Sequence, residues 1–477
     1  MAQKDKTLKK HKITEELRED NLAKDTFKLA LPAIMEMIMQ TLLGFADMAM
    51  VGGLGAAAIA SIGLSDMPMM TAMSVFAAIS VGTTALVARA IGAKKPKEAG
   101  EVAKQSLIIS VLIGVVFTIL ALCLARSIIV LMGAEQDVIP ISTEYFKITS
   151  LGLPMMIITL IMSGVLRGTG DTKTPMYING AANLLNIIGN FFLIYESRTL
   201  SFVIPIIRKN VNIFIPGAGM GVAGAGIATT ISRVVGGVIV LFIVFSDKIP
   251  IKINLKEKIK LDFKIIKRIF NIGIPAAIEQ FFMRFGQLLF GRIVSSLGTV
   301  MYASHRITLT AESLSFNVGF GFALAATTLV GQYLGAEKPE VAEKSGFVAV
   351  KMGAIFMGSV GIIFFLFPDL LLKIFTRDQE ILKYSRSCLR IVAISQPFLA
   401  ACMGFAGGLR GAGDTRSVLI ITVLGIWCVR LSLAYLFAIV LGYGLIGAWI
   451  AMSVDLIFRG CLLFFRFKSG KWKKVQV

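Results

Sequence analysis

Hydrophobic residues along this chain gather in long runs that are separated by short polar or charged stretches. An apolar run of about 20 residues is long enough to cross the hydrocarbon core of a bilayer as a helix. The pattern therefore predicts an all-α polytopic membrane protein with twelve transmembrane helices. The expected helices lie at about 27–50, 56–90, 100–131, 139–166, 173–195, 220–246, 265–297, 302–333, 342–373, 381–409, 416–441 and 444–467.

The second half of the chain repeats the first. Adding 243 to each residue number pairs LRGTGDT (166–172) with LRGAGDT (409–415). Further along, GVAGAGIA (221–228) matches GLIGAWIA (444–451) at an offset of 223, so about twenty residues have been inserted in the first half. This insert, near 196–216, has two apolar runs around a polar turn, which is typical of a hairpin, and we expect it to be extracellular.

Two six-helix repeats of one orientation predict two pseudo-symmetric lobes. Transporters with this arrangement place their site near the bilayer midplane, between halves that rock against each other. The expected parts are a charged cytoplasmic N-terminal segment (1–26), an N-lobe of helices 1–6 (27–245), a cytoplasmic linker (246–264), a C-lobe of helices 7–12 (265–467) and a basic cytoplasmic tail (468–477).

The distribution of charge supports a membrane protein and sets its orientation. Only 16% of the residues are charged, against about 25% in soluble domains. Lys and Arg concentrate in segments such as 89–104 and 246–268, as expected of loops on the cytoplasmic side. We therefore expect both termini in the cytoplasm and the chain in the plasma membrane. The net charge of +20 then follows from topology and does not indicate nucleic acid.

Residues that hold metals or carry out catalysis are scarce. The five cysteines contain no C-x-x-C pair, and the chain has only two histidines. This composition disfavours a cysteine- or histidine-based metal centre. No nucleophile–base constellation is evident either, so we expect no enzyme and no resident cofactor.

Carboxylates interrupt the apolar runs. Glu36 and Asp47 are eleven residues apart, which places them on nearly the same helix face and roughly 16 Å apart along it. Pro32 and Glu36 recur 243 residues later as Pro275 and Glu279, and each proline is expected to kink its helix. A carboxylate inside a bilayer is costly and is by default a functional group.

The doubled pattern resembles the multidrug and toxic compound extrusion (MATE) family of antiporters, within the MOP flippase superfamily. The resemblance rests on the P-x-x-x-E opening, GFADMAMVG (44–52), both LRG-x-GDT loops and GVAGAGIAT (221–229). It covers nearly the whole chain, from about 25 to 466. It implies a twelve-helix fold that exports amphipathic organic cations in exchange for protons or sodium ions.

The resemblance also suggests residues that bind the coupling ion. Asp47 matches the family's first-helix aspartate, and its expected partners are Asn186, Asn190 and Thr229. Asn190 replaces the second carboxylate of DinF-like members. Glu279 matches a seventh-helix glutamate of other branches. A carboxylate in an apolar lobe can exchange protons, and carboxylate, amide and hydroxyl oxygens also suit Na⁺, so both ions remain open.

Other polar residues in the helices extend these hypotheses. The tenth-helix aspartate of NorM-like members has no counterpart in 394–411, and Glu312 and His305 are candidates to supply the missing polarity. We expect Arg430 to pair with Glu279, Glu312 or Asp455, and Arg284 is a possible partner of Glu279. The full set of candidates is Glu36, Asp47, Asn186, Asn190, Thr229, Glu279 and Glu312 for the coupling ion, Met37, Gln40, Phe282, Gln287 and His305 for the substrate cavity, and Arg284, Arg430 and Asp455 for structural charge pairs.

The R-G-x-G-D-T loops are interpreted as structural, with Asp171 and Asp414 capping the next helix, because the lysine of a phosphate-binding loop is absent.

The alternatives to a multidrug antiporter are a flippase for lipid-linked precursors, a membrane-embedded enzyme and a channel. We expect a monomer surrounded by membrane lipid.

Overall fold

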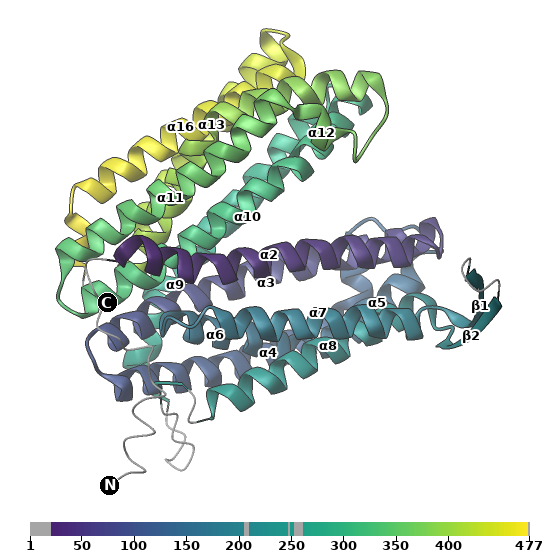
Figure 1. The fold of residues 1–477 in the computed structure, drawn as a ribbon, viewed down its shortest axis with the longest axis horizontal. Coiled ribbons are helices and arrows are strands. Elements are labelled where there is room, and N and C mark those ends of the chain that lie inside the picture. Colours follow the sequence, from purple (N-terminus) through teal and green to yellow (C-terminus); the bar gives the residue numbers. More distant parts are fainter. Residues whose placement is uncertain (1–20, 205–208, 247–248, 252–260, 476–477) are drawn as a thin grey trace.

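Two bundles of long helices meet at one end of the molecule and diverge toward the other (Figure 1). The computed structural model describes residues 21–204, 209–246, 249–251 and 261–475. The first half contains α2 (Leu22–Gly52), α3 (Ala56–Gly92), α4 (Pro96–Leu131), α5 (Ile139–Leu151), α6 (Leu153–Gly168), α7 (Lys173–Leu193), β1 (Glu196–Ile204), β2 (Lys209–Ala218) and α8 (Gly221–Val244). The second half contains α9 (Phe263–Ser295), α10 (Thr299–Gly335), α11 (Pro339–Leu366), α12 (Pro368–Leu372), α13 (Gln379–Gly411), α14 (Thr415–Val423), η3 (Leu424–Leu431), α15 (Ser432–Tyr435), η4 (Leu436–Val440), α16 (Gly444–Lys468) and η5 (Lys471–Lys474).

The number of membrane-spanning helices agrees with the sequence prediction. Within the described residues, nine helices are long and apolar enough to cross a membrane, with residues 415–440 counted as one helix. The bent pair α5–α6 adds a tenth span if it is counted as one helix. Helices α7 and α9 bring the total to twelve. They fall short on apolarity because α7 carries asparagines and α9 carries several charged residues. The predicted all-α membrane architecture is confirmed, and the helices are consistent with the expected twelve.

The internal repeat extends to the helix boundaries. Gly55 precedes α3 with φ of 100°, and Gly298 precedes α10 with φ of 112°, a left-handed backbone region that glycine adopts without steric cost. Pro96 and Pro339 open α4 and α11, where the missing N–H would have had no partner in the helix. Both pairs obey the 243 offset, so corresponding helices begin at corresponding residues.

Three predicted helices differ in detail. The helix expected at 342–373 breaks at Phe367, where φ is −126° and ψ is 49°, because a following proline disfavours the helical conformation. The helix expected at 139–166 bends by 48° between α5 and α6. The helix expected at 416–441 contains the π-helical segments η3 and η4, a widening that is often found at functional sites.

The first helix of each half begins in the core of the other half. Leu29 and Ile34 of α2 belong to a hydrophobic cluster that is otherwise formed by the second half. Ile269 and Ile272 of α9 belong to a cluster that is otherwise formed by the first half. Beside Ile34, Gly321 lets the helices approach closely, because an added Cβ would lie 2.4 Å from Ile34 Cγ1. The two bundles are therefore joined by a reciprocal crossing of α2 and α9.

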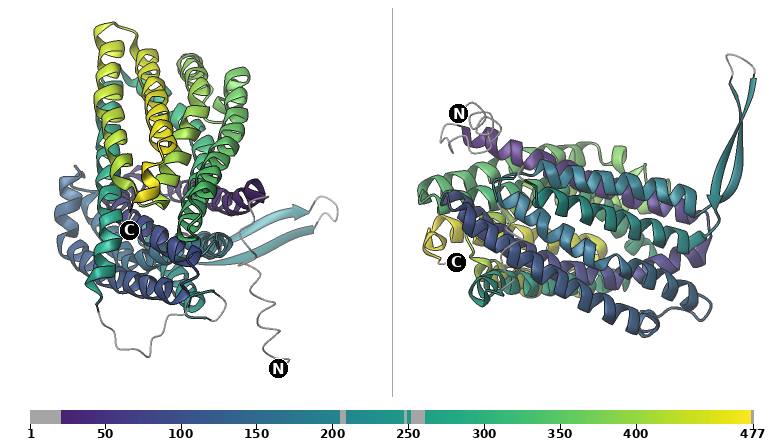
Figure 2. Two further views of the ribbon diagram at one scale, coloured as in Figure 1. Left: turned by 90° about the vertical axis from the view of Figure 1, so that its left-hand side faces the viewer. Right: turned by 90° about the horizontal axis from the view of Figure 1, so that it is seen from below.

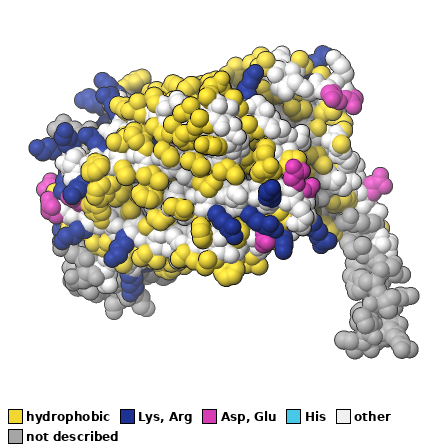
Figure 3. Space-filling model, turned by 90° about the horizontal axis from the view of Figure 1, so that it is seen from above, with side chains coloured by type: hydrophobic (Ala, Val, Ile, Leu, Met, Phe, Trp, Pro, Cys, Tyr) yellow, Lys and Arg dark blue, Asp and Glu magenta, His cyan; other side chains and the backbone are white. Residues whose placement is uncertain are grey.

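The two ends of the molecule differ in character. We call the end where α2 begins and α16 ends the basic end, because Lys94, Lys95, Lys338 and the lysines of η5 lie there. The opposite end is the hairpin end, since the antiparallel strands β1 and β2 project from it (Figure 2). The hairpin expected from the insert is thus present. Hydrophobic side chains cover most of the face between the two ends (Figure 3), as suits contact with lipid.

Two expected parts fall largely outside the described residues. Of the N-terminal segment (1–26), only residues 21–26 are described, and these form the start of α2. Of the linker (246–264), residues 247–248 and 252–260 are not described.

Candidate functional site

The first-helix aspartate and the three polar partners expected around it meet in the N-lobe. Asn190 Nδ2 donates to Asp47 Oδ1 at 2.7 Å and to Asn186 Oδ1 at 3.2 Å. Asn186 in turn lies 3.1 Å from Thr229 Oγ1. When the Asn186 amide is turned over, its nitrogen also reaches Asp47 Oδ1 at 2.9 Å. Helices α2, α7 and α8 thus place one carboxylate, two amides and one hydroxyl in a single cluster.

The N-lobe cluster is larger than the sequence suggested. Asp66 of α3 interacts electrostatically with Asp47, and Arg233 of α8 interacts with Asp66 and with Tyr145 of α5. Arg233 is held by its own hydrogen bond, from Nη1 to the carbonyl of Thr149 at 3.1 Å. Sequence reasoning missed Asp66 and Arg233. The available signal was that each is a charged residue inside an apolar run.

The C-lobe has no equivalent of this cluster among its described residues. The N-lobe positions are Asp47, Asp66, Tyr145, Asn186, Asn190, Thr229 and Arg233. Offsets of 243 and, for the last two, 223 lead to Phe290, Leu309, Cys388, Val429, Leu433, Met452 and Leu456. Most of these belong to one hydrophobic cluster. Because all seven polar positions have become apolar or weakly polar, only the N-lobe retains this arrangement.

Glu36 lies in a second, separate arrangement closer to the basic end. Its Oε1 accepts from Arg167 Nη2 and from Asn179 Nδ2, both at 2.7 Å. The side chain of Glu36 is 1% exposed. Glu36 and Asp47 therefore share α2 but have different partners, and Glu36 is a neutralised member of a buried ion pair.

Glu279 repeats this arrangement in the C-lobe. Its Oε1 accepts from Arg410 Nη2 at 2.7 Å and from Thr422 Oγ1 at 3.0 Å. Every member is related to its N-lobe counterpart by 243 residues. Glu279 is thus paired with Arg410 and not with Arg284, whose side chain is exposed on α9. The sequence named Arg284 as a possible partner because it is close along the helix, and Arg430 as another candidate. The folded chain instead brings Arg410 of the R-G-x-G-D-T loop to the carboxylate.

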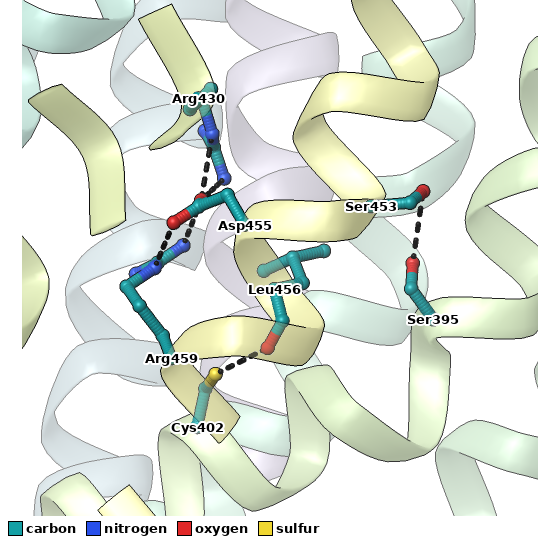
Figure 4. A network of polar contacts seen from close by, with 7 residues as sticks. All are labelled: Ser395, Cys402, Arg430, Ser453, Asp455, Leu456 and Arg459. Atoms are coloured by element: carbon teal, nitrogen blue, oxygen red, sulfur yellow. Dashed lines mark hydrogen bonds and ion pairs between the residues drawn. The ribbon is translucent and has the colours of Figure 1, made fainter. Parts of the chain in front are cut away.

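A third group of charges lies deeper in the C-lobe. Arg430 Nη2 is 2.8 Å from Asp455 Oδ2, and Arg459 Nε is 2.8 Å from Asp455 Oδ1. Figure 4 shows the two arginines on either side of this carboxylate, with Cys402 donating to the carbonyl of Leu456 below them. Two guanidinium groups thus share one fully buried aspartate. Arg459 was not singled out from the sequence.

Glu312 supplies a further charge near this group. Its side chain is 9% exposed, and it interacts electrostatically with Arg430. Two arginines and two acidic side chains, Asp455 and Glu312, therefore lie together inside the C-lobe. Such compensation is expected where charges are buried, because an unpaired charge there is strongly unfavourable.

The five residues expected to form a substrate cavity come from three helices, α2, α9 and α10. His305 is buried in the C-lobe, with Phe290 and Trp449 each 5.6 Å from its ring. Phe282 packs edge-to-face on Trp427. In the remaining three positions, Met37 is half-buried and Gln40 and Gln287 are exposed.

Asp171 and Asp414 hold the two R-G-x-G-D-T loops. Asp171 Oδ1 accepts from the backbone nitrogen of Thr174 at 3.0 Å. Asp414 accepts from Ser417 Oγ at 2.7 Å and pairs with Arg466 Nη2 at 2.8 Å. Asp171 therefore caps a backbone nitrogen of the following helix. Asp414 makes no such bond to the backbone of α14 and instead contacts side chains of α14 and α16.

Together these features define a class of protein. Twelve membrane-spanning helices in two related halves, joined by crossing first helices and containing buried charges, are the architecture of a secondary transporter. Within the described residues, no group of three or more His, Cys, Asp or Glu side chains could hold a metal ion.

Comparison with known proteins identifies the family. The MatE family profile matches residues 32–192 and 275–436, one copy in each half. A probable multidrug resistance protein NorM of Thermotoga maritima is 36% identical over 460 residues, which cover 96% of this chain and 94% of that protein. The uncharacterised transporter YisQ of Bacillus subtilis is 25% identical over 94% of both chains. The chain belongs to the MATE family, and it is a transporter rather than an enzyme.

Solved structures support the same assignment. A structure described as the outward-facing conformation of a multidrug resistance MATE family transporter of the MOP superfamily matches with a TM-score of 0.84 and 25% identity, over 94% of this chain and 97% of that one. A MOP superfamily transporter from Pyrococcus furiosus, for which a reverse polarity of the binding pocket suggests a different function, matches with a TM-score of 0.83 and 25% identity, over 95% and 97%.

Proposed function

We propose that this protein is a cation-coupled antiporter that exports amphipathic organic cations, with Asp47 as the residue for which ion and substrate compete. The observation that carries the proposal is the N-lobe cluster, in which a carboxylate inside a membrane helix is surrounded by amide and hydroxyl groups. The name of the relative from Thermotoga maritima, a probable multidrug resistance protein, supports the choice of substrate class.

The chemistry of the cluster suits either coupling ion. A proton would neutralise Asp47 directly. Sodium would be bound by oxygens from Asp47, Asn186, Asn190 and Thr229, a ligand type that hard cations prefer. Asn190 Oδ1 is buried without a hydrogen-bond partner, so it has a free acceptor to offer after a rotation of the amide. The cycle requires no resident cofactor.

Competition for one negative charge explains exchange. An organic cation and a proton or sodium ion each need the carboxylate of Asp47, so the two cannot occupy it together. Asn190 donates to this carboxylate in the state described here, which ties α2 to α7. Binding of either ligand would replace that hydrogen bond and so alter how the two helices are held.

The arrangement of the two bundles supports alternating access. The two bundles meet at the basic end and diverge toward the hairpin end (Figure 1). The positive-inside rule assigns the basic end to the cytoplasm, so the described state faces outward, and both termini are cytoplasmic. The hairpin then lies outside the cell, and the membrane is the plasma membrane. Transport requires a second state in which the basic end opens.

The test is transport by purified protein in liposomes. A fluorescent organic cation is followed under an imposed pH gradient, and then under a sodium gradient with the pH clamped. We expect one gradient to drive cation movement, and Asp47→Asn to abolish it. The matched control is Asp137→Asn, the same chemical change at an exposed loop position. Full activity of Asp47→Asn would refute the role of the cluster. If neither gradient moves a cation, the antiporter assignment fails and lipid-linked substrates become the next probe.

A further inference from the structure

We propose that the two R-G-x-G-D-T loops link the buried glutamates of α2 and α9 to the closure between the lobes, with Arg167 and Arg410 as positioning residues. The inference rests on the alternating-access cycle proposed above. It concerns a motif that the sequence indicated only as a structural turn.

The lobes close on each other through the ends of these loops. Thr328 Oγ1 of α10 donates to the carbonyl of Arg167 at 3.0 Å, and Gln332 Nε2 of the same helix donates to the carbonyl of Gly168 at 3.0 Å. In the other direction, Arg89 Nη2 of α3 donates to the carbonyl of Ala412 at 3.0 Å. Each lobe therefore donates to the repeated loop of the other.

The closure obeys the internal symmetry. Arg89 and Gln332 are 243 residues apart, and so are Gly92 and Gly335. A Cβ added at Gly92 would lie 1.8 Å from the carbonyl oxygen of Gln332, and one at Gly335 would lie 2.0 Å from that of Arg89. The two glycines thus permit the backbones of α3 and α10 to touch at the basic end.

The acceptors are suited to a contact that must open and close. Carbonyl groups in the last turn of a helix lack a partner within the helix. At the ends of α6 and α13, such carbonyl groups accept the hydrogen bonds from the other lobe. When the lobes separate, water at the membrane surface can replace the lost donor. Each hydrogen bond then contributes only modestly to closure, because folding or docking exchanges bonds to water for bonds to protein.

The same loops hold the carboxylates. Arg167 uses its backbone carbonyl to accept from Thr328 of the other lobe and its guanidinium to bind Glu36 of α2. Glu36 follows the part of α2 that is packed in the C-lobe core, so its pairing with Arg167 fixes where α2 returns to its own lobe. Arg410 and Glu279 do the same for α9.

A consequence is that loss of the ion pair should weaken the hydrogen bonds between the lobes, and loss of those bonds should weaken the ion pair. If the guanidinium of Arg167 is released from Glu36, the end of α6 is held less firmly, and its carbonyl groups are hydrogen-bonded to Thr328 and Gln332 for less of the time. In the N-lobe the closure and the ion pair are thus coupled through one residue, Arg167, although they are made by different atoms of it. In the C-lobe the acceptor Ala412 lies two residues after Arg410, in the same loop.

The test measures the population of the closed basic end. Spin labels are placed at Lys97→Cys and Lys338→Cys, exposed positions in the two lobes, and their distance distribution is recorded in lipid nanodiscs. The exposed Cys123, Cys428 and Cys461 are first replaced by serine, while the buried cysteines stay.

Thr328→Val removes one donor to the other lobe without changing the shape of the side chain. We expect the ratio of open to closed distances to rise about fivefold, as for the loss of one hydrogen bond. Thr327→Val is the matched control, because its hydroxyl donates to Ala323 and Gly407 within its own lobe. Gln332→Leu provides a second variant and should act like Thr328→Val. No shift in either variant, or an equal shift in the control, would overturn the proposal.

The coupling itself is tested by combining Thr328→Val with Glu36→Gln. Independent sites give additive free-energy changes, so an effect of Thr328→Val that is the same with and without Glu36→Gln would refute the link. We expect the rise in the open-to-closed ratio that Thr328→Val causes to be at least about threefold smaller when Glu36→Gln is also present. Because the distances are measured without substrate or gradient, the result is separable from a failure of the transport assay.

Discussion

Replacement of Arg410 by methionine should strongly destabilise the C-lobe. Arg410 Nη2 lies 2.7 Å from Glu279 Oε1, and the side chain of Glu279 is only 3% exposed. Breaking a buried ion pair from one side costs about 3–5 kcal/mol, because the remaining charge stays buried without its counter-charge. Arg410 is 21% exposed, so water reaches the vacated position in part, and we take the lower value of about 3 kcal/mol.

This free energy converts into a measurable change in the unfolding temperature. A unit of about 200 residues loses roughly 2–4 °C per kcal/mol, so the midpoint should fall by about 6–12 °C. The assay is the loss of monodisperse protein with temperature in detergent, followed by size-exclusion chromatography. The control is Arg416→Met, which removes an arginine that is exposed at the start of α14 and should leave the midpoint nearly unchanged.

The decisive measurement is rescue. Glu279→Gln removes the charge that Arg410→Met leaves behind, and Thr422 can still donate to the amide oxygen that replaces Oε1. The double variant should therefore regain most of the lost stability, since replacing both partners of a buried pair is often nearly neutral. A double variant as unstable as Arg410→Met would show that the arginine stabilises the lobe by packing, and the ion-pair argument would be refuted.

Three other changes have sharp expected outcomes. Asp47→Asn should abolish coupled efflux while the protein stays folded, which is checked by transport and elution volume together; an inactive but misfolded variant would not support the site. Asp171→Ala removes the cap on the nitrogen of Thr174 and should cost about 1 kcal/mol, seen as lower yield with transport retained; a well-expressed, inactive protein would contradict the structural role. Gly335→Ala places a Cβ 2.0 Å from the carbonyl oxygen of Arg89, so it should prevent closure of the basic end and stop transport, and unchanged transport would show that the contact is dispensable.

The fold could be predicted from the sequence because membrane helices leave a simple signal. An apolar run must reach a minimum length to span the bilayer, so each helix can be recognised from its run. Because the sequence repeats, each helix boundary is also indicated at two places in the chain, as at Pro96 and Pro339. The break at Phe367 was missed because its cause is local backbone conformation before a proline, which leaves the hydrophobic pattern unchanged. The π-helical widening after Val423 likewise leaves no periodic signature of its own.

The candidate site was predicted only in part, for a different reason. Asp47 and its amide partners were found because a carboxylate in an apolar run is conspicuous and the resemblance supplied the rest. Arg167 and Arg410 were overlooked because they fall at helix ends, where an arginine is ordinary. Only the folded chain shows that each of these side chains points inward to a glutamate 131 residues away. Sequence spacing suggested Arg284 as a possible partner of Glu279, since contacts along one helix can be counted from the sequence and contacts between helices cannot.

The contact between Arg89 and the end of the chain has a consequence for biosynthesis. Arg89 Nη2 also donates to the carbonyl of Val475 at 3.0 Å, a partner 386 residues later. At a synthesis rate of about 5–20 residues per second, roughly 20–80 s pass between the two. During that time the N-lobe can fold in the membrane, but Arg89 at the basic end has neither the carbonyl of Ala412 nor that of Val475 to bind. A nascent chain in this condition offers chaperones and proteases a defined period in which to recognise it, before the completed protein first closes at its basic end.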